Sequence, residues 1–359
     1  MFSSFFLKSF RILLLPFALV YWLAITIRNW MYNKKILHTT SFALPLICVG
    51  NLSVGGTGKS PMVEYLVRLL KDKFKVATLS RGYKRRTRGY ALANETSDAL
   101  DIGDEPMQFH IKFPDVPVAV GEERLDAIPQ LLHDRPETQV IILDDAFQHR
   151  TIRAGLNILL TDYNNLFTRD FYLPTGDLRD LKSEYKRAEI IIVTKCNPDL
   201  SENERQNLIK EINPAAGQSV FFTAIQYGQP YHILSKTGFS FTNNTEVLLV
   251  SGIANPRPLK LMLEKYSKAY YLLQYPDHRI FTIDDLKEIR KKFTAIDSVD
   301  KIILTTEKDA VRLVKFNTEI TGLPLYIIPV RHHFLYGEEG RFAQLVIDFI
   351  QNPGQAAKN

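Results

Sequence analysis

The chain has 359 residues, of which 45% are hydrophobic, so it is long enough for two domains and does not have the composition of a disordered protein. Lysine and arginine exceed aspartate and glutamate by 45 to 39, a mild excess that suits an anionic lipid or a phosphorylated substrate as well as nucleic acid. Two cysteines, Cys48 and Cys196, are too few for a zinc site or a disulfide framework and indicate a reducing compartment.

The N-terminal segment contains an apolar run without charges, Ile12 to Ile27, with basic residues on both sides. These 16 residues would form a helix of roughly 24 Å, which is shorter than the ~30 Å hydrocarbon core of a bilayer. No small-residue cleavage site follows, so removal as a signal peptide is not expected. One interpretation is a buried core helix. The other, which we favour for residues 1–35, is a membrane-associating helix, interfacial or marginally spanning, with Trp22 and Trp30 at the headgroup boundary.

Short apolar runs alternate with helical patterns from residue 44 onward, which predicts an α/β fold with a mostly parallel sheet. Because the strand runs are almost continuously apolar, we expect both faces of this sheet to be buried. The predicted strands of the first half are 44–51, 75–83, 116–121, 139–146, 156–162 and 189–195. The predicted helices are 61–70, 104–113 and 122–134.

A change of pattern near residues 215–245 predicts a domain boundary. The stretch SVFFTAIQYGQPYHI indicates a hairpin with Gly228 and Pro230 near its turn, and polar residues follow it. We therefore expect a larger domain over 36–218 and a two-stranded linker over 219–245. A second, smaller α/β domain over 246–359 would end in a closing C-terminal helix.

The stretch GNLSVGGTGKSP, Gly50 to Pro61, matches a phosphate-binding P-loop except that serine replaces the first glycine. An apolar strand precedes it and a proline-initiated helix follows, as the motif requires. Backbone amides and the helix N-terminus would hold nucleotide phosphates, Lys59 would reach the terminal ones, and Ser60 would bind Mg²⁺. The predicted nucleotide-binding residues are Ser53, Val54, Gly55, Gly56, Thr57, Gly58, Lys59 and Ser60.

A second element, VIILDDAFQH, delivers Asp144 and Asp145 to the carboxyl end of an apolar strand. That edge of a parallel sheet is where ligands bind, and an acid there opposite the P-loop serine predicts a Walker B site for Mg²⁺. These two elements leave a kinase and a switch ATPase as alternatives. The deviant P-loops of partitioning ATPases place a lysine near the start of the loop, where this chain has Ser53 and Val54.

Taken together, the motifs resemble the tetraacyldisaccharide 4'-kinases of lipid A biosynthesis. The matching stretches run in order from residue 50 to 313: GNLSVGGTGKSP, SRGYKRR, GDEPMQF, VAVGEERLDA, LDDAFQH, LPTGDLRD, VSGIANP, DHRIF and TTEKDAVRL. The resemblance implies a P-loop kinase with two α/β domains and an N-terminal helix on the cytoplasmic face of the inner membrane. It implies transfer of the ATP γ-phosphoryl group to the 4'-hydroxyl of a tetraacyl disaccharide 1-phosphate.

The resemblance also implies roles for individual residues. Asp104 matches the acid that activates the acceptor hydroxyl, and His278 matches its partner in the smaller domain. Arg124 and Arg179 match basic residues near the transferred phosphate, and the pair at 144 and 145 matches the Walker B acids. Asp180 stands where the family usually has a glutamate that reaches Mg²⁺ or a metal-bound water, so its reach is shorter by one methylene group.

The expected function is therefore ATP- and Mg²⁺-dependent phosphorylation of a lipid A precursor to give lipid IVA. The expected partners are the lipid disaccharide substrate and a membrane surface, with no nucleic acid and no obligate protein partner. The alternative is a membrane-tethered P-loop ATPase whose hydrolysis switches a protein partner.

Overall fold

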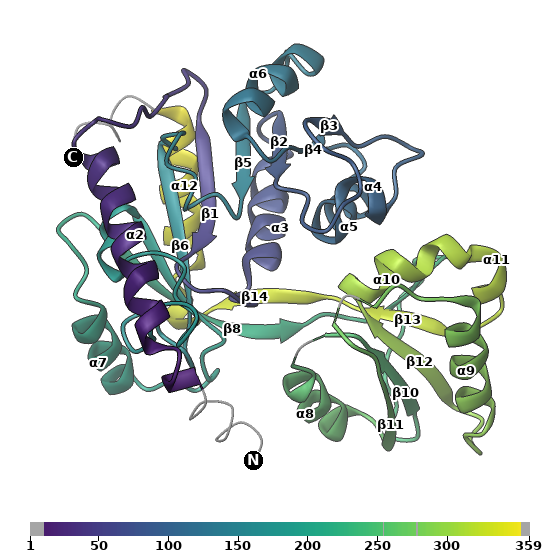
Figure 1. The fold of residues 1–359 in the computed structure, drawn as a ribbon. Helices are drawn as coiled ribbons and strands as arrows, with labels where there is room; N and C mark the ends of the chain where they lie inside the picture. The colour runs from purple at the N-terminus through teal and green to yellow at the C-terminus, as the bar shows by residue number, and fades with distance from the viewer. Residues whose placement is uncertain (1–10, 254, 278, 353–359) are drawn as a thin grey trace.

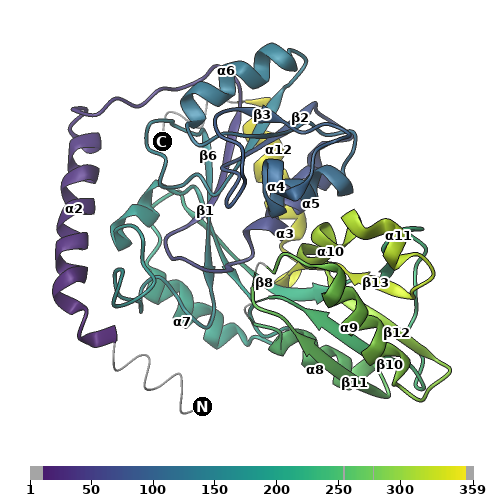
Figure 2. The ribbon, with the colours of Figure 1, turned by 45° about the vertical axis from the view of Figure 1, so that its right-hand side comes forward.

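The computed structural model describes residues 11–253, 255–277 and 279–352, and Figures 1 and 2 show two views of it. The described residues form two sheets, each covered by helices. The helices are α2 (Leu15–Asn33), α3 (Lys59–Leu70), α4 (Ala99–Ile102), α5 (Asp104–Lys112), α6 (Arg124–Asp134), α7 (Glu202–Ile212), α8 (Arg257–Tyr266), α9 (Ile283–Thr294), α10 (Glu307–Leu313), α11 (Asn317–Ile320) and α12 (Glu339–Gln351).

The larger sheet has nine strands within the described part of the chain, in the order β14-β8-β7-β6-β1-β5-β2-β4-β3. The strands are β1 (Leu46–Asn51), β2 (Val76–Ser80), β3 (Ala91–Leu92), β4 (Val118–Val120), β5 (Val140–Asp144), β6 (Leu156–Asp162), β7 (Ile190–Thr194), β8 (Ser219–Tyr227) and β14 (Val330–Phe334). Seven neighbouring strands, from β8 to β4, run parallel, while β3 and β14 pair antiparallel at the two edges. The predicted α/β class with a mostly parallel sheet is confirmed.

Apolar clusters cover both faces of this sheet, as the continuous strand runs predict. On one face, Met62 and Leu66 of α3 pack with Phe342 and Val346 of α12 against the strands. On the other face, α6 and α7 contribute, for example through Ile128 and Leu208. The strands that carry the predicted phosphate loop and acids, β1 and β5, lie side by side in the middle of this core.

The smaller sheet has the order β11-β10-β12-β13-β9 among the described residues, and only β9 is antiparallel to its neighbour. Its strands are β9 (Tyr231–His232), β10 (Glu246–Ser251), β11 (Ala269–Gln274), β12 (Lys301–Thr306) and β13 (Leu325–Ile328). Two further clusters form its core, around Leu248 and Leu249 on opposite faces of β10. The second half of the chain therefore repeats the β/α alternation in a smaller unit.

The hairpin expected within 219–245 is wrong. β8 does not pair with the segment that follows it; β9 joins the smaller sheet instead, and the partner of β8 is β14, with Tyr227 opposite Val330 and Thr223 opposite Phe334. β8 and β14 together form the two-stranded ribbon between the two parts of the molecule (Figure 1). Strand pairing depends on contacts far along the chain, so a local turn signal at Gly228 could not identify this partner.

The C-terminal helix is also placed differently from the expectation that it closes the smaller domain. Phe342, Val346, Phe349 and Ile350 of α12 belong to the core of the larger sheet. The chain therefore returns through β14 to the first unit, and 246–359 is not a contiguous domain.

The N-terminal helix α2 lies along one side of the larger unit (Figure 2) and is not a buried core helix. Only Ala18, Ile25 and Asn29 of α2 are buried, whereas Phe17 and Val20 are 65% and 68% exposed. Within the described ranges, no helix combines the length and apolar character needed to cross a bilayer.

Candidate active site

The phosphate loop joins β1 to α3 at the carboxyl edge of the larger sheet. Gly55 and Gly58 adopt φ of 107° and 89°, the left-handed region that glycine tolerates best. Ser53, in place of the usual first glycine, is buried and pairs with Leu178, and the Val54 amide donates to the Asp177 carbonyl at 2.7 Å. The loop start is thus braced by the neighbouring 177–178 segment, which explains how a serine is accommodated there.

Lys59 and Arg179, two of the predicted phosphate-neutralising residues, meet in one network. Lys59 Nζ lies 3.2 Å from Asn51 Oδ1 and 3.5 Å from Asp145 Oδ1. Arg179 donates to Asp145 Oδ2 at 3.0 Å and to Asn51 Oδ1 at 2.5 Å. These cations lower the pKa of Asp145 against the effect of its burial, so the carboxylate is ionised.

Asn51 was missed by the sequence analysis as a site residue, although it belongs to the quoted P-loop stretch. Its carboxamide oxygen accepts from Lys59 and Arg179, and its Nδ2 donates to Thr57 Oγ1 at 3.0 Å. As the last residue of β1, it therefore links the strand, the loop and both cations.

Asp144 ends β5 and is buried beside this network. Ser80 donates to its Oδ2 at 3.3 Å, while its buried Oδ1 has no hydrogen-bond partner among the described residues. Burial and the neighbouring Asp145 raise the pKa of Asp144 to about 7. A buried carboxylate oxygen left in this way fits a hard cation such as Mg²⁺, which usually takes one or two protein carboxylates together with phosphate oxygens.

Arg124 is fully buried at the start of α6. Its guanidinium donates to the carbonyl oxygens of Gly121, Glu122 and Asp144, the last at 3.3 Å. Burial lowers its pKa to about 10, so it stays charged near neutral pH. The structure thus places Arg124 behind the Walker B strand, where it holds the backbone; its expected contact with the transferred phosphate remains a prediction.

Asp104, the predicted base, is buried at the first position of α5 and is held from the smaller sheet. Arg312 of α10 donates its Nε to Asp104 Oδ1 at 2.7 Å and its Nη2 to Oδ2. Arg312 also donates to the carbonyl of Arg279 at 3.0 Å. His278, the predicted partner of Asp104, lies outside the described residues. Arg312 belongs to the quoted TTEKDAVRL stretch but received no role from the sequence.

Asp180 lies against the N-terminal helix. Its Oδ1 accepts from Asn29 Nδ2 at 2.7 Å and from the Leu181 amide at 2.9 Å. Across the ranges that the structure describes, no three His, Cys, Asp or Glu side chains gather as a metal site. Oδ2 of Asp180 is buried without a hydrogen-bond partner among the described residues and lies 3.8 Å from Arg187 Nη2, so the role of Asp180 as a metal ligand remains a prediction.

Comparison with known proteins identifies the family. The family model described as tetraacyldisaccharide-1-P 4'-kinase matches residues 10–351. The chain belongs to the tetraacyldisaccharide 4'-kinase family. It is 42% identical over 357 residues to the tetraacyldisaccharide 4'-kinase of Parabacteroides distasonis, covering 95% of each chain. It is 44% identical over 342 residues to that of Flavobacterium johnsoniae, covering 95% of this chain and 97% of the relative.

A solved structure agrees with this assignment. LpxK from Aquifex aeolicus, crystallised in complex with ATP, matches with a TM-score of 0.74 and 28% identity, over 95% of this chain and 99% of that one. The resemblance to tetraacyldisaccharide 4'-kinases inferred from the motifs is confirmed, and the chain is an enzyme of this kinase family.

Proposed function

We propose that this kinase transfers the γ-phosphoryl group of ATP to the 4'-hydroxyl of a tetraacyldisaccharide 1-phosphate, giving lipid IVA in lipid A biosynthesis. The observation that carries this proposal is the P-loop network of Lys59, Asn51, Asp145 and Arg179, in a chain that matches the family along almost its whole length. The curated relatives are named for this activity, and the Aquifex structure holds ATP.

The geometry supports different roles for the loop amides, which would bind the ATP phosphates, and for the cations, which would neutralise the phosphate charge. Amides of the glycine-rich loop and the N-terminus of α3 would hold the ATP phosphates. Lys59 and Arg179 both contact Asp145 and Asn51, which hold the two positive charges together beside the phosphate loop. Asp144 and the Ser60 hydroxyl would hold Mg²⁺, which supplies further neutralisation of phosphate charge when bound.

The acceptor hydroxyl needs a base, and Asp104 is the candidate. In the structure, Arg312 contacts both oxygens of the Asp104 carboxylate and so fixes its orientation at the start of α5. α5 carries Asp104 from the larger unit and α10 carries Arg312 from the smaller one, so the base lies where the two units meet. A sugar hydroxyl brought to this junction would lose its proton to Asp104 as it attacks the γ-phosphorus.

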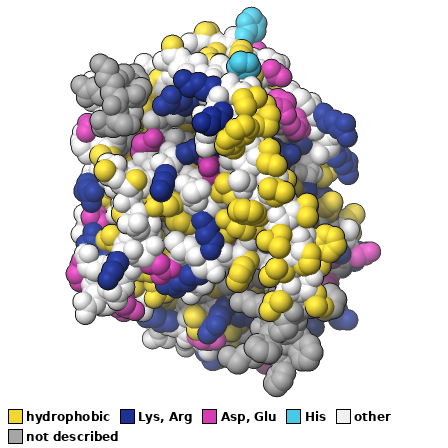
Figure 3. All heavy atoms as spheres, turned by 60° about the vertical axis from the view of Figure 1, so that its left-hand side comes forward, with side chains coloured by type: hydrophobic (Ala, Val, Ile, Leu, Met, Phe, Trp, Pro, Cys, Tyr) yellow, Lys and Arg dark blue, Asp and Glu magenta, His cyan; other side chains and the backbone are white. Residues whose placement is uncertain are grey.

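We further propose that α2 attaches the enzyme to the cytoplasmic face of the inner membrane by lying in the bilayer interface. Figure 3 shows a band of hydrophobic side chains on the face where α2 lies, with lysine and arginine side chains nearby. Ile12 and Leu13, just before α2, and Phe17 and Val20 of α2 are 62–69% exposed. Polar contacts hold the inner side of α2, including Tyr21 to the Arg179 carbonyl at 2.9 Å. A lipid acceptor in the membrane would thus approach the enzyme close to Arg179.

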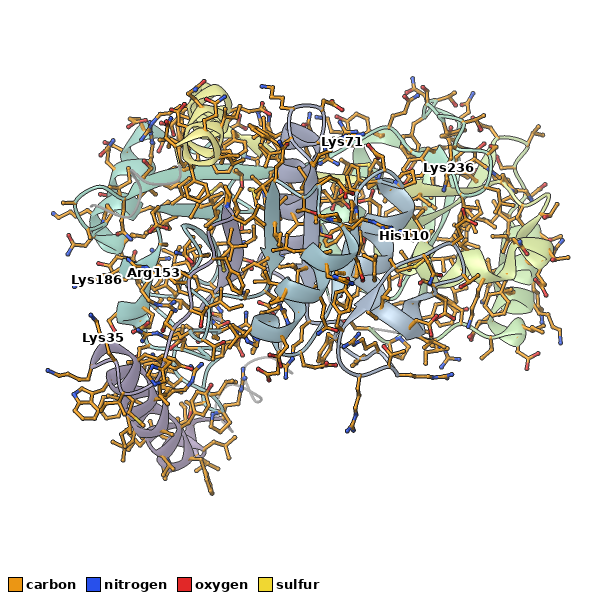
Figure 4. All side chains as sticks on the ribbon, turned by 90° about the horizontal axis from the view of Figure 1, so that it is seen from above. Lys35, Lys71, His110, Arg153, Lys186 and Lys236 are labelled. Atoms are coloured by element: carbon orange, nitrogen blue, oxygen red, sulfur yellow. The ribbon has the colours of Figure 1, made fainter. Side chains whose placement is uncertain are left out.

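Basic residues next to the end of α2 support the proposal that this side of the molecule faces the membrane. A groove of about 890 Å³ begins where α2 ends and is lined by Lys35, Arg153 and Lys186 among others. Figure 4 shows these three residues on the side of the molecule where α2 lies. Each basic residue near an anionic bilayer contributes about 1 kcal/mol, and one apolar element plus basic residues gives firmer attachment than either alone.

The kinase proposal is tested by incubating the protein with ATP, Mg²⁺ and purified tetraacyldisaccharide 1-phosphate in detergent micelles, followed by mass spectrometry of the lipid. We expect one added phosphate with the wild type, formed about 10³-fold more slowly or slower still with Lys59→Ala. ATP hydrolysis with unchanged lipid under every detergent condition would reject the proposal in favour of the switch ATPase.

The membrane proposal is tested by sedimentation with phospholipid vesicles. Replacing Leu13, Phe17 and Val20 together by serine leaves the buried Ala18, Ile25 and Asn29 in place and should abolish sedimentation. The matched control replaces three exposed apolar residues of the smaller unit, Leu261, Tyr271 and Ile280, and should sediment like the wild type. Equal sedimentation of both variants would contradict the interfacial placement of α2.

A further inference from the structure

Two successive carbonyl groups of the phosphate loop are held by side chains from other strands. The Thr194 hydroxyl, at the end of β7, donates to the Thr57 carbonyl at 2.8 Å. His332 Nε2, in β14, lies 2.9 Å from the Gly58 carbonyl, which also accepts the Met62 amide at 3.2 Å. The backbone at the end of the loop is therefore fixed from outside the loop.

Holding these carbonyls also sets the direction of two amides. A trans peptide places its N–H opposite its C=O, so the Gly58 and Lys59 amides point away from Thr194 and His332. These two amides belong to the group at a helix N-terminus that has no partner within the helix and can bind an anion. Pro61, the third residue of α3, has no N–H, so each remaining amide contributes a larger share of phosphate binding.

The His332 ring is itself fixed in one orientation. Its Nδ1 lies 2.9 Å from Thr223 Oγ1, and the Gly58 carbonyl can only accept, so Nε2 carries the proton and Nδ1 accepts from the hydroxyl. Burial lowers the pKa of His332 to about 4, so the ring is neutral near physiological pH. A Cβ at Gly58 would lie 3.0 Å from His332 Cε1, so glycine permits this close contact as well as the backbone turn.

We propose that His332 is a positioning residue of the nucleotide site, which directs the phosphate-loop amides toward ATP from the ribbon that joins the two units. The same strand contacts the smaller unit two residues earlier, where the Val330 amide donates to Glu307 Oε2 at 3.2 Å. β14 therefore links α10, which carries Arg312, to the loop that holds ATP. This inference rests on the proposed function, because it assumes that the loop binds ATP.

The test compares His332→Leu with His332→Gln, since glutamine retains an N–H donor of similar reach. Leucine should raise the KM for ATP about 10-fold and reduce the ATP-induced rise in unfolding temperature, because it leaves the Gly58 carbonyl with one partner fewer. The KM for the lipid should stay unchanged. Glutamine should return the KM for ATP to within about 3-fold of wild type. The control, His333→Leu, changes the exposed neighbour on the same strand and should behave like wild type.

An unchanged KM for ATP in His332→Leu would overturn the inference, as would an equal loss in His332→Gln, which would assign the effect to ring packing. If His332→Leu does not fold, Thr223→Val removes the hydroxyl that orients the ring and should still raise the KM for ATP selectively; no rise would also overturn the inference. If the wild-type protein neither phosphorylates the lipid nor responds to ATP, the proposed function fails first and this inference fails with it.

Discussion

The phosphate loop and the candidate base Asp104 are both held by charged and hydrogen-bonded contacts, but from different parts of the molecule. Lys59, Asn51, Asp145 and Arg179 all belong to the larger unit, and the ribbon strand β14 adds His332 to the same sheet. Asp104 instead depends on Arg312, which lies 208 positions further along the chain and beside the smaller sheet.

This difference separates nucleotide binding from activation of the acceptor. The contacts of the loop network lie within the larger sheet, including β14, so ATP binding should depend less on the smaller unit than the position of Asp104 does. The Asp104 contact exists only when α5 and α10 are together. A second ionic cluster lies at the same junction, because Lys112 of α5 reaches Glu64 of α3 at 2.5 Å and also Glu307 of α10. Changes at the two regions should therefore affect different kinetic constants.

The largest effect is expected from Lys59→Ala, which removes one of the two cations of the loop network. Turnover should fall about 10³-fold or more, with ATP affinity changing less, because contacts to the transferring phosphoryl group strengthen in the transition state. Rates of lipid phosphorylation under single-turnover conditions measure this directly. Lys210→Ala, on the exposed face of α7, is the control and should be unchanged.

A smaller loss is expected from Arg312→Ala, which removes the guanidinium group that contacts both oxygens of Asp104. We expect kcat to fall roughly 10- to 100-fold while the dissociation constant for ATP stays within about twofold, because the loop network is untouched. Since Arg312 acts through Asp104, the double variant Asp104→Ala/Arg312→Ala should be no slower than Asp104→Ala alone. Multiplicative losses would show that Arg312 acts independently of the base.

Substitutions of Asn29 and Asp180 distinguish two roles of Asp180: contact with α2, or binding of Mg²⁺ beside the loop network. If this residue anchors α2 through Asn29, then Asn29→Ala and Asp180→Ala should both expose the segment after α2 to limited proteolysis, since a buried hydrogen bond contributes about 1–3 kcal/mol. The Mg²⁺ concentration for half-maximal activity should stay within about twofold in both. A large increase confined to Asp180→Ala would instead support the predicted role of Asp180 as a metal ligand.

The smallest effect is expected from Glu307→Gln, and it depends on pH. Burial, and then the neighbouring Glu64, raise the pKa of Glu307 from 4.5 to about 7, while Lys112 opposes the shift. The folded protein thus holds a proton that the unfolded chain loses near pH 4.5, so stability from this group is lost as pH rises toward 7. Relative to wild type, the variant should gain a few degrees in unfolding temperature between pH 5 and pH 8. Glu319→Gln, an exposed control, should show no such trend.

Much of the fold was predictable because its signals are local. Continuous apolar runs identified β1, β5, β6 and β7, and the glycine spacing with Lys59 and Ser60 identified the loop. The failures concern pairings between distant residues. Thr223 and His332 are 109 positions apart, so no local pattern could predict that β8 pairs with β14. The apolar face of α12 predicts that this helix packs on a sheet, but not on which of the two sheets.

The site shows the same division. Lys59, Arg179, Asp144 and Asp145 were expected near phosphate or metal, and the structure gathers them around the loop. The neighbouring parallel strands β1 and β5 bring the loop beside the two acids, and Arg179 reaches Asp145 from the long segment between β6 and β7. Arg312 could not be given a role from the sequence, because its role depends on the contact with Asp104, which only the fold brings about. Asp180 matched the family motif by position, but the contact with Asn29 depends on where α2 lies.

The most direct measurement of the central claim is the rate of ADP formation from ATP and Mg²⁺ with and without the purified disaccharide lipid. A lipid kinase should form ADP at an appreciable rate only when the lipid is present, in a one-to-one ratio with phosphorylated lipid. The same rate without lipid, or ADP formation that responds to an added protein and not to the lipid, would contradict the proposed kinase activity.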